Sequence, residues 1–167
     1  MRVDEHDYVE HRIDIENLRN NINDYDGVIV VDYDKGFLHE EDLNEILCMH
    51  KNIFLHTKKK LNQNYIEARF IQINQYEYEN TYDEIKDMGN RIEDKLIVTY
   101  GDKGCYYQKR LYPSPRRIET RDLSGAGDTF MAAFSVSMLN SNDIKKAIDF
   151  AQECATVVVQ KHGVSTI

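Results

Sequence analysis

An alternation of short apolar runs with amphipathic segments restricts the fold of this chain more than any other feature. Runs rich in Val, Ile, Leu and Phe occupy residues 27–32, 52–57, 69–74 and 95–101. Segments whose apolar residues recur with helical spacing occupy residues 14–23, about 40–50 and about 82–93. Strands that alternate with helices in this way form a parallel sheet covered by helices. The pattern therefore predicts an α/β fold, a three-layer α/β/α sandwich with a mostly parallel sheet, in a single domain spanning residues 1–167.

The ends of the predicted strands indicate where a site would lie. Because the run GVIVVD at 27–32 is β-branched and uninterrupted, it predicts a strand buried on both faces. In open α/β sheets, ligands bind beyond the carboxyl ends of the strands. Asp32, His56, Asn74 and Gly101 all fall at such ends. We therefore expect these residues to surround a ligand.

The C-terminal part predicts a smaller β element followed by helices. Residues 104–110 and 116–120 are expected to form a short β pair, because prolines break the chain between them. Helical spacing of apolar residues then continues over 126–139 and 143–160.

Composition narrows the classes of partner and site. The formal net charge of −8 argues against nucleic acid or an anionic membrane as a partner. No apolar run approaches the roughly 20 residues of a membrane span. Cys48, Cys105 and Cys154 are widely spaced, which favours reduced, buried thiols in a cytoplasmic protein over disulfides or a zinc site.

The stretch DLSGAGDTF at 122–130 carries the clearest chemical signal. Where a helix begins, its first backbone N–H groups lack intrahelical partners and attract an anion. Gly125 and Gly127 have no Cβ, so a phosphate would be able to approach the main chain there. Asp128 would then accept a proton from a hydroxyl that attacks this phosphate. The alternative is an ordinary helix start, with Ser124 as the N-cap and Asp128 stabilised by the helix dipole.

Further motifs stand along the chain in a fixed order. They are HTKK at 56–59, INQYE at 73–77, TYGDKG at 99–104, DLSGAGDTF at 122–130 and KHGVST at 161–166. In this set and order the chain resembles the ribokinase-like (PfkB) carbohydrate kinase family. It departs from the family pattern at three positions. His56 stands where an Asp is common, Leu123 where a hydroxyl residue is usual, and Gln152 where many members have Asn.

The resemblance implies ATP and Mg²⁺ as cofactors and a role for each matching residue. Asp128 would be the base that takes the proton from a sugar hydroxyl. The N–H groups of Gly125, Ala126 and Gly127 would bind the γ-phosphate. Glu77 would hold Mg²⁺ through water. The residues implied for the nucleotide site are Lys58, Asn74, Glu77, Thr99, Gly101, Gly104, Gln152 and Gly163. Lys58 is equally consistent with a solvent-facing lysine in the run 58–60.

Within the family, VVDYDKGFL at 30–38 resembles an element of the kinases that act on heptose 7-phosphate in ADP-heptose synthesis. This resemblance implies that Asp32 and Lys35 bind the sugar substrate, with Lys35 meeting a sugar phosphate as a point charge. In the alternative, Asp32 caps the loop and Lys35 is a solvated surface charge.

The resemblance covers the C-terminal half of the family's kinases, so the sheet is expected to be incomplete at its N-terminal side. Residues 1–12 would be a remnant of the lid or its return strand. We expect the missing half as a partner, or self-association as a dimer over the exposed edge of the sheet. Three functions remain open: a sugar kinase or part of one, a non-catalytic nucleotide-binding or interaction fragment, and a kinase of another substrate such as fructose or a nucleoside.

Overall fold

A computed structural model describes residues 12–115 and 125–160 of the chain. One sheet contains six strands in the order of the sequence. They are β1 (Val28–Asp32), β2 (Ile53–Thr57), β3 (Phe70–Asn74), β4 (Leu96–Thr99), β5 (Cys105–Tyr107) and β6 (Arg110–Tyr112). Strands β1 to β4 pair in parallel, whereas β5 and β6 are antiparallel to their neighbours. The sheet is therefore mostly parallel, as the alternating pattern predicted.

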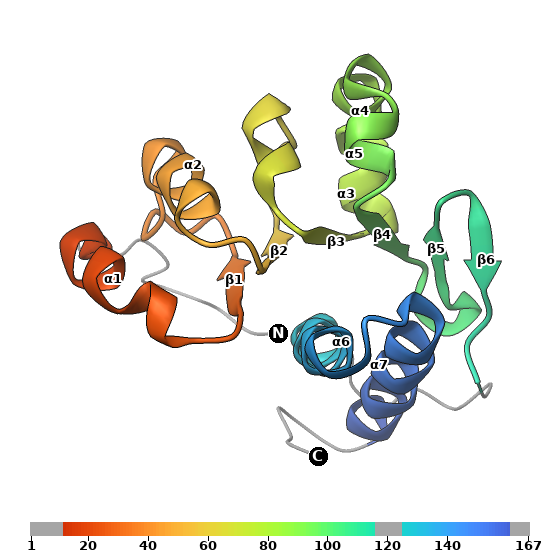
Figure 1. Cartoon of the computed structure of the whole chain (residues 1–167). Coiled ribbons are helices and arrows are strands. Elements are labelled where there is room, and N and C mark those ends of the chain that lie inside the picture. The colour runs from red at the N-terminus through yellow and green to blue at the C-terminus, as the bar shows by residue number, and fades with distance from the viewer. Residues whose placement is uncertain (1–11, 116–124, 161–167) are drawn as a thin grey trace, which may run out of the picture.

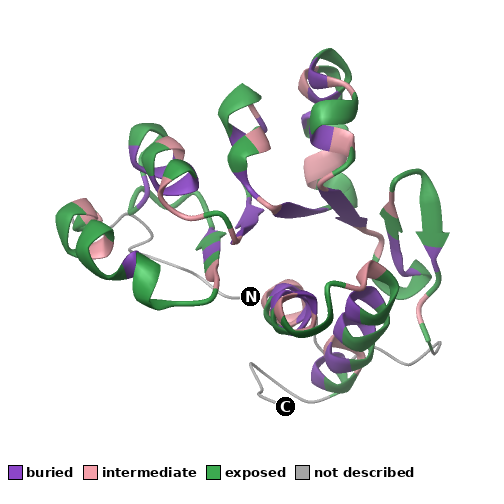
Figure 2. Ribbon diagram, in the orientation of Figure 1, coloured by how far each residue is buried: buried purple, intermediate pink, exposed green. Residues whose placement is uncertain are grey.

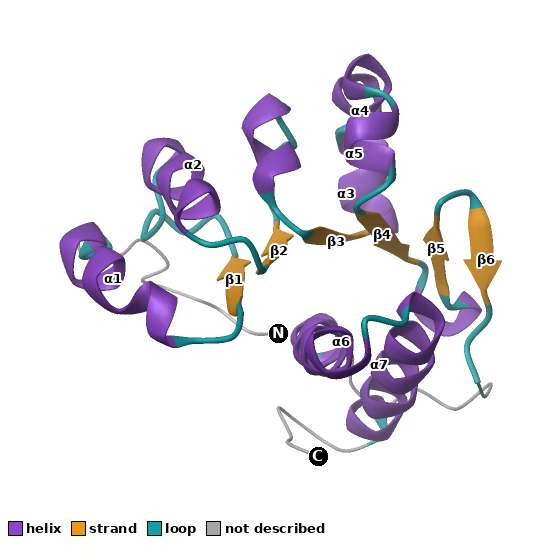
Figure 3. Cartoon of the chain, viewed as in Figure 1, coloured by secondary structure: helices purple, strands orange, loops and turns teal. Residues whose placement is uncertain are grey.

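Helices cover the two faces of this sheet (Figure 1, Figure 3). On one face lie α1 (Ile15–Asn21), α2 (Glu40–Met49), α3 (Gln75–Asn80), α4 (Tyr82–Met88) and α5 (Asn90–Glu93), together with a 3-10 turn at Gln63–Glu67. On the other face lie α6 (Ala126–Ser141) and α7 (Ile144–Val159). The three-layer α/β/α architecture is thereby confirmed.

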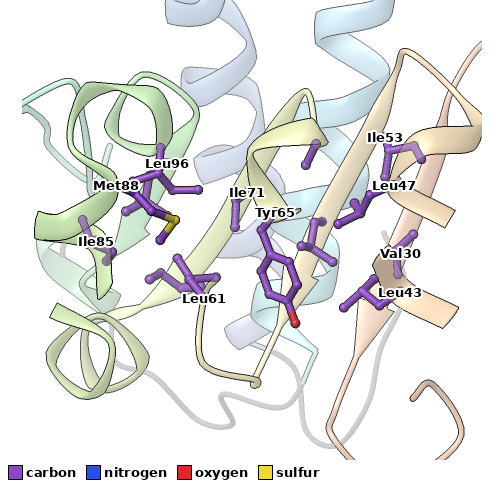
Figure 4. Close-up of a cluster of buried hydrophobic side chains, with 14 of the residues drawn as sticks. Val30, Leu43, Leu47, Ile53, Leu61, Tyr65, Ile71, Ile85, Met88 and Leu96 are labelled. Atoms are coloured by element: carbon purple, nitrogen blue, oxygen red, sulfur yellow. The ribbon is translucent and has the colours of Figure 1, made fainter. Parts of the chain in front are cut away.

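Each face of the sheet has its own core. Beneath α2 to α5, the buried side chains include Leu43, Tyr65 and Ile71 (Figure 4). On the α6 face the core is aromatic, and the ring of Phe134 lies 5.0 Å from that of Phe70, centroid to centroid, at an angle of 82°. Edge-to-face packing of this kind adds to the burial of the rings. Both helical layers are thus fixed to the sheet by apolar contacts.

Strand β1 corrects one expectation from the sequence. Val30 is 8% exposed, but Ile29 is 40% exposed and Val31 is 36% exposed, so only one face of β1 is buried. The reason is its position at the end of the sheet: α6 covers β1 only in part, and α7 lies toward the β5 side of the sheet (Figure 1, Figure 2). An unbroken β-branched run did not distinguish an edge strand from a central one.

The β pair of the C-terminal half also differs from the prediction. Strand β5 pairs with β6 across a two-residue turn formed by Gln108 and Lys109, whose φ angles are 48° and 62°. The predicted partner, at 116–120, lies outside the described residues. A two-residue turn with positive φ matches the twist of a hairpin, which explains why the chain returns so early.

The remaining helix and cysteine predictions are mostly confirmed. The predicted helix at about 82–93 is two helices, because Gly89 with φ 57° ends α4. Cys105 and Cys154 are buried, but Cys48 is exposed, because α2 turns Leu43 and Leu47 toward the core and Cys48 toward solvent. None of the described helices is long and apolar enough to cross a membrane.

Candidate active site

The glycine-rich stretch forms the start of α6. Gly125 is the N-cap and adopts a left-handed conformation with φ 78°, which favours glycine, and its carbonyl accepts from the N–H of Thr129 at 2.9 Å. A Cβ on Gly127 would lie 3.0 Å from Cε1 of His56, so this glycine lets the helix approach the end of β2 closely. Ser124, the alternative N-cap, lies outside the described residues. The first turn of α6 therefore presents its N–H groups at the carboxyl end of the sheet.

Asp128, in this first turn, is contacted from two strands. The hydroxyl of Tyr33, which follows β1, donates to Oδ2 of Asp128. Nδ1 of His56, in β2, lies 3.3 Å from Oδ1. Neither Nδ1 nor Oδ1 has a well-aligned hydrogen-bond partner among the described residues, although both are buried. The carboxylate is thus held between a phenol and an imidazole.

The environment of Tyr33 keeps its hydroxyl protonated. Burial, followed by the hydrogen bond to Asp128 and its charge, raises the pKa of Tyr33 to about 12. The ammonium of Lys58 lies 4.7 Å from the centroid of the Tyr33 ring, in a cation–π contact. At neutral pH, Tyr33 is therefore a hydrogen-bond donor to Asp128, with a positive charge over its ring.

A cavity of about 130 Å³ opens beside the start of α6. It collects four residues predicted for the nucleotide site, which come from β4, the loop after it and α7: Thr99, Gly101, Gly104 and Gln152. Ala126 and Gly127 of α6 line the same cavity. Residues far apart in the sequence are thereby brought together. Gly163 lies outside the described residues.

The loop after β4 needs glycine at its end. Gly104 has a φ of 102°, and a Cβ there would lie 2.1 Å from the carbonyl oxygen of Tyr112. Gly101 has a φ of 58°, but a Cβ there would meet no atom within 4 Å. Both residues are in a conformation that other residues rarely adopt, but only Gly104 also has a backbone atom in the way.

We expect Gly104→Ala to lower the free energy of unfolding more than Gly101→Ala does. Positive φ alone costs about 1–2 kcal/mol for a residue with a Cβ. The Gly104 variant adds a clash with backbone, which only movement of β6 relieves. Thermal and denaturant unfolding of the two variants measure the difference. Equal losses would show that β6 moves away freely and that the close approach is unimportant.

Lys58, Asn74 and Glu77 lie together at a second cavity, of about 250 Å³. Asn74 and Glu77 cap α3 reciprocally: Oδ1 of Asn74 accepts from the N–H of Glu77 at 2.9 Å, and Oε2 of Glu77 accepts from the N–H of Asn74 at 2.8 Å. Asn74 pairs in register with Thr99 of the next strand, so this group adjoins the first cavity. The sequence spacing N-x-x-E thus has a structural role as a capping box.

Asp32 and Lys35 have different surroundings. Asp32 is 6% exposed, and its Oδ2 accepts from Nζ of Lys59 at 2.6 Å while its Oδ1 accepts from the N–H of Asp34 at 2.9 Å. Burial alone would lower the pKa of Lys59, but the hydrogen bonds to Asp32 and Asp34 outweigh it and raise that pKa. Both carboxylate oxygens of Asp32 therefore accept hydrogen bonds that fix the loop. Lys35 is exposed on this loop.

Sequence reasoning did not assign a role to two residues at this site. Tyr33 stands 95 positions from Asp128, and no spacing rule connects them. Gln72, in β3, is 1% exposed, and its Nε2 would lie 3.5 Å from a Cβ on Gly127. Its position before Asn74 at the carboxyl end of β3 was the available signal, because side chains there face the ligand side of the sheet.

Comparison with known proteins identifies the family. The model of the pfkB family carbohydrate kinases matches residues 56–167, which is more than half of the chain. The chain belongs to this family. The Bifunctional protein HldE of Helicobacter pylori (strain G27) is 32% identical over 161 residues, an alignment that covers 85% of this chain and 35% of that protein. The chain therefore spans about a third of the length of the curated relatives it matches.

Solved structures agree on the pfkB family fold. Ribokinase from Thermotoga maritima superposes with a TM-score of 0.68 at 17% identity, covering 91% of this chain and 55% of that one. Ribokinase from Arabidopsis thaliana, complexed with ribose and ATP, gives a TM-score of 0.67 at 19% identity, covering 94% and 56%. At these identities the likeness shows the ribokinase-like fold alone.

Proposed function

We propose that the chain is the nucleotide-binding and catalytic part of a carbohydrate kinase that transfers the γ-phosphoryl group of ATP to a sugar hydroxyl. One observation carries this proposal. Asp128 stands in the first turn of α6, and the same turn, through Ala126 and Gly127, lines the cavity that also contains Thr99 and Gln152. A base, an anion-binding helix end and a cavity for the nucleotide thus meet at one point.

The chemistry expected at this point is mostly positioning and charge stabilisation. The N–H groups of Gly125 to Gly127 would bind the transferred phosphoryl group while charge develops on it. Asp128 would accept the proton of the attacking hydroxyl. Its hydrogen bond from Tyr33 and its contact with His56 hold the carboxylate in place before the substrate arrives.

ATP would enter with Mg²⁺, which neutralises charge on the phosphates. Among the described residues, no group of three His, Cys, Asp or Glu side chains is arranged to hold a metal ion. Mg²⁺ in kinases is bound mainly by phosphates and water with one or two carboxylates, so the donor set here fits. Glu77 would supply that carboxylate through water, because only its Oε2 is used in the capping contact with Asn74.

Heptose 7-phosphate is the sugar that the loop after β1 favours. The element VVDYDKGFL resembles that of the heptose 7-phosphate kinases, and the relative HldE aligns over 85% of this chain. Lys35 would meet the sugar phosphate, while Asp32 would act through Lys59 and Asp34 by fixing the loop. Fructose and nucleosides are the competing substrates, and a substrate panel separates them.

The rest of a complete sugar site would come from a partner. The chain covers 55% of the Thermotoga ribokinase and 35% of the HldE relative. We propose that an N-terminal part of the kinase supplies the missing contacts, or that two copies associate when it is absent. The partly exposed face of β1, which carries Ile29 and Val31, supports such a contact.

We expect the nucleotide site to function in the isolated chain, because its described residues, from Lys58 to Gln152, all belong to this chain. Calorimetry should show weak binding of Mg-ATP and ADP. Ala155→Phe should abolish it, because Ala155 lines the cavity, whereas Glu153→Phe, exposed on the same helix, should leave it unchanged. No heat of binding at millimolar nucleotide, or equal effects of the two variants, would contradict the proposed site.

A further inference from the structure

The hydroxyl of Tyr33 lies beside the proposed base, Asp128, in the position expected for the hydroxyl that accepts the phosphoryl group. A sugar hydroxyl that is about to be phosphorylated must donate its proton toward Asp128. In this structure the group that donates to Oδ2 of Asp128 is the phenol of Tyr33. Tyr33 as a residue is 43% exposed, so it is not part of the buried core. A protein hydroxyl thus stands in the position that the mechanism reserves for the substrate.

Hydrogen bonds hold both ends of the loop that carries Tyr33. Immediately after β1, Asp32 accepts from the N–H of Asp34 at 2.9 Å and from Nζ of Lys59 at 2.6 Å. The same ammonium donates to the carbonyl of Leu38 at 2.9 Å. These contacts span the loop from 32 to 38, so Tyr33 reaches Asp128 from a fixed position. A hydroxyl held in this way has a high effective concentration beside Asp128, which favours a reaction within one molecule.

We propose that, when ATP is bound and no sugar is present, the chain transfers the γ-phosphoryl group to its own Tyr33. This inference rests on the proposed function, because it uses Asp128 as the base and the start of α6 as the phosphate site. It goes beyond that function in naming a modification site on the chain itself.

The step balances without any further reactant. The O–H bond of Tyr33 breaks and its proton moves to Oδ2 of Asp128, while the phenolic oxygen forms a bond to the γ-phosphorus. The bond between this phosphorus and the β–γ bridging oxygen breaks, and ADP leaves with the electron pair. Asp128 then loses the proton to water. The products are phosphotyrosine, ADP and a proton.

The surroundings of Tyr33 suit this step. A phenol gives up its proton more readily than an aliphatic alcohol, so a base placed for a sugar hydroxyl suffices even with the pKa of Tyr33 raised to about 12. The ammonium of Lys58, 4.7 Å from the ring centroid, places a positive charge over the phenol ring. This charge offsets the repulsion between the phosphate and Asp128.

The test is incubation of the purified chain with Mg-ATP, followed by intact mass and peptide mapping. We expect the mass of one phosphoryl group to be added at Tyr33, with a first-order rate that does not change with protein concentration. Tyr33→Phe should lose the modification entirely, and Asp128→Asn should slow it by about 10²–10⁴-fold. Tyr25→Phe is the matched control, because Tyr25 is 64% exposed and precedes β1 far from Asp128; it should be modified normally.

Several results would overturn the inference. They are phosphate on another residue, a rate that rises with protein concentration, and an unmodified chain that binds Mg-ATP in calorimetry. The last result would mean that Tyr33 only orients Asp128. Absence of ATP binding in the same calorimetry would instead overturn the proposed function, and the inference with it. Thermal melting of Tyr33→Phe confirms that the variant is folded.

Discussion

Replacing Asp128 by Asn is expected to lower turnover by about 10²–10⁴-fold in any active assembly that contains this chain, with nucleotide binding unchanged. Asparagine has nearly the same shape but accepts no proton at neutral pH. Tyr33 is able to donate to the amide oxygen as it does to Oδ2, so the start of α6 should keep its geometry. The loss should therefore appear in kcat, measured by coupled ADP release, and not in the affinity for ATP.

Asp149→Asn is the matched control for this prediction. Asp149 lies on α7 and forms a surface ion pair with Lys145, four residues before it. Such exposed pairs contribute about 0–1 kcal/mol, so this variant should keep its turnover and its stability. Turnover close to wild type in Asp128→Asn would show that Asp128 serves the helix dipole only. Loss of nucleotide binding in the same variant would show a structural role.

The strands and helices were predictable because each has a periodic apolar pattern. Runs such as 52–57 and 69–74 became β2 and β3, with bounds that differ by one residue. Exposure of β1 was not predictable, because an uninterrupted run of Val and Ile is equally suited to an edge and to a central strand. Only the order of strands in the sheet decides which neighbours Ile29 and Val31 have.

The start of α6 was predictable from the sequence, because its glycines act through the backbone. Gly125 adopts a positive φ that favours glycine, Gly127 lets α6 approach His56 closely, and both glycines are visible in the sequence itself. Contacts between side chains have no comparable signal in the sequence. Tyr33, His56 and Asp128 meet only after three elements have packed, so neither their proximity nor the use of Asp32 by Lys59 followed from spacing.

The final prediction concerns the apolar surface beside β1. On the face of the sheet that α6 partly covers, Ile29 and Val31 are 40% and 36% exposed. The outer edge of β1 has no strand beside it in the described sheet. Apolar side chains next to an open strand edge favour association with another chain. We expect light scattering to give a mass above the 19.6 kDa of one chain.

Substitutions locate this association. Ile29→Lys places a charge on the partly exposed face of β1 and should shift the chain toward the monomer, because burying an unpaired ammonium is costly. Val157→Lys is the control, because Val157 is 40% exposed but lies on α7, away from β1. If both variants remain associated, the contact lies elsewhere on the molecule.

The same surface should control activity. Phosphoryl transfer to a sugar requires that water be excluded from the phosphate, and an open site leaves water as a competitor. The chain alone should therefore show only background ADP release with heptose 7-phosphate. Activity should appear when the part of the Helicobacter pylori relative that lies outside the matched region is supplied as a separate chain. Ile29→Lys should weaken this complementation and Val157→Lys should not, because only the first alters the docking face. A 19.6 kDa monomer that phosphorylates the sugar unaided would contradict this dependence on a second chain.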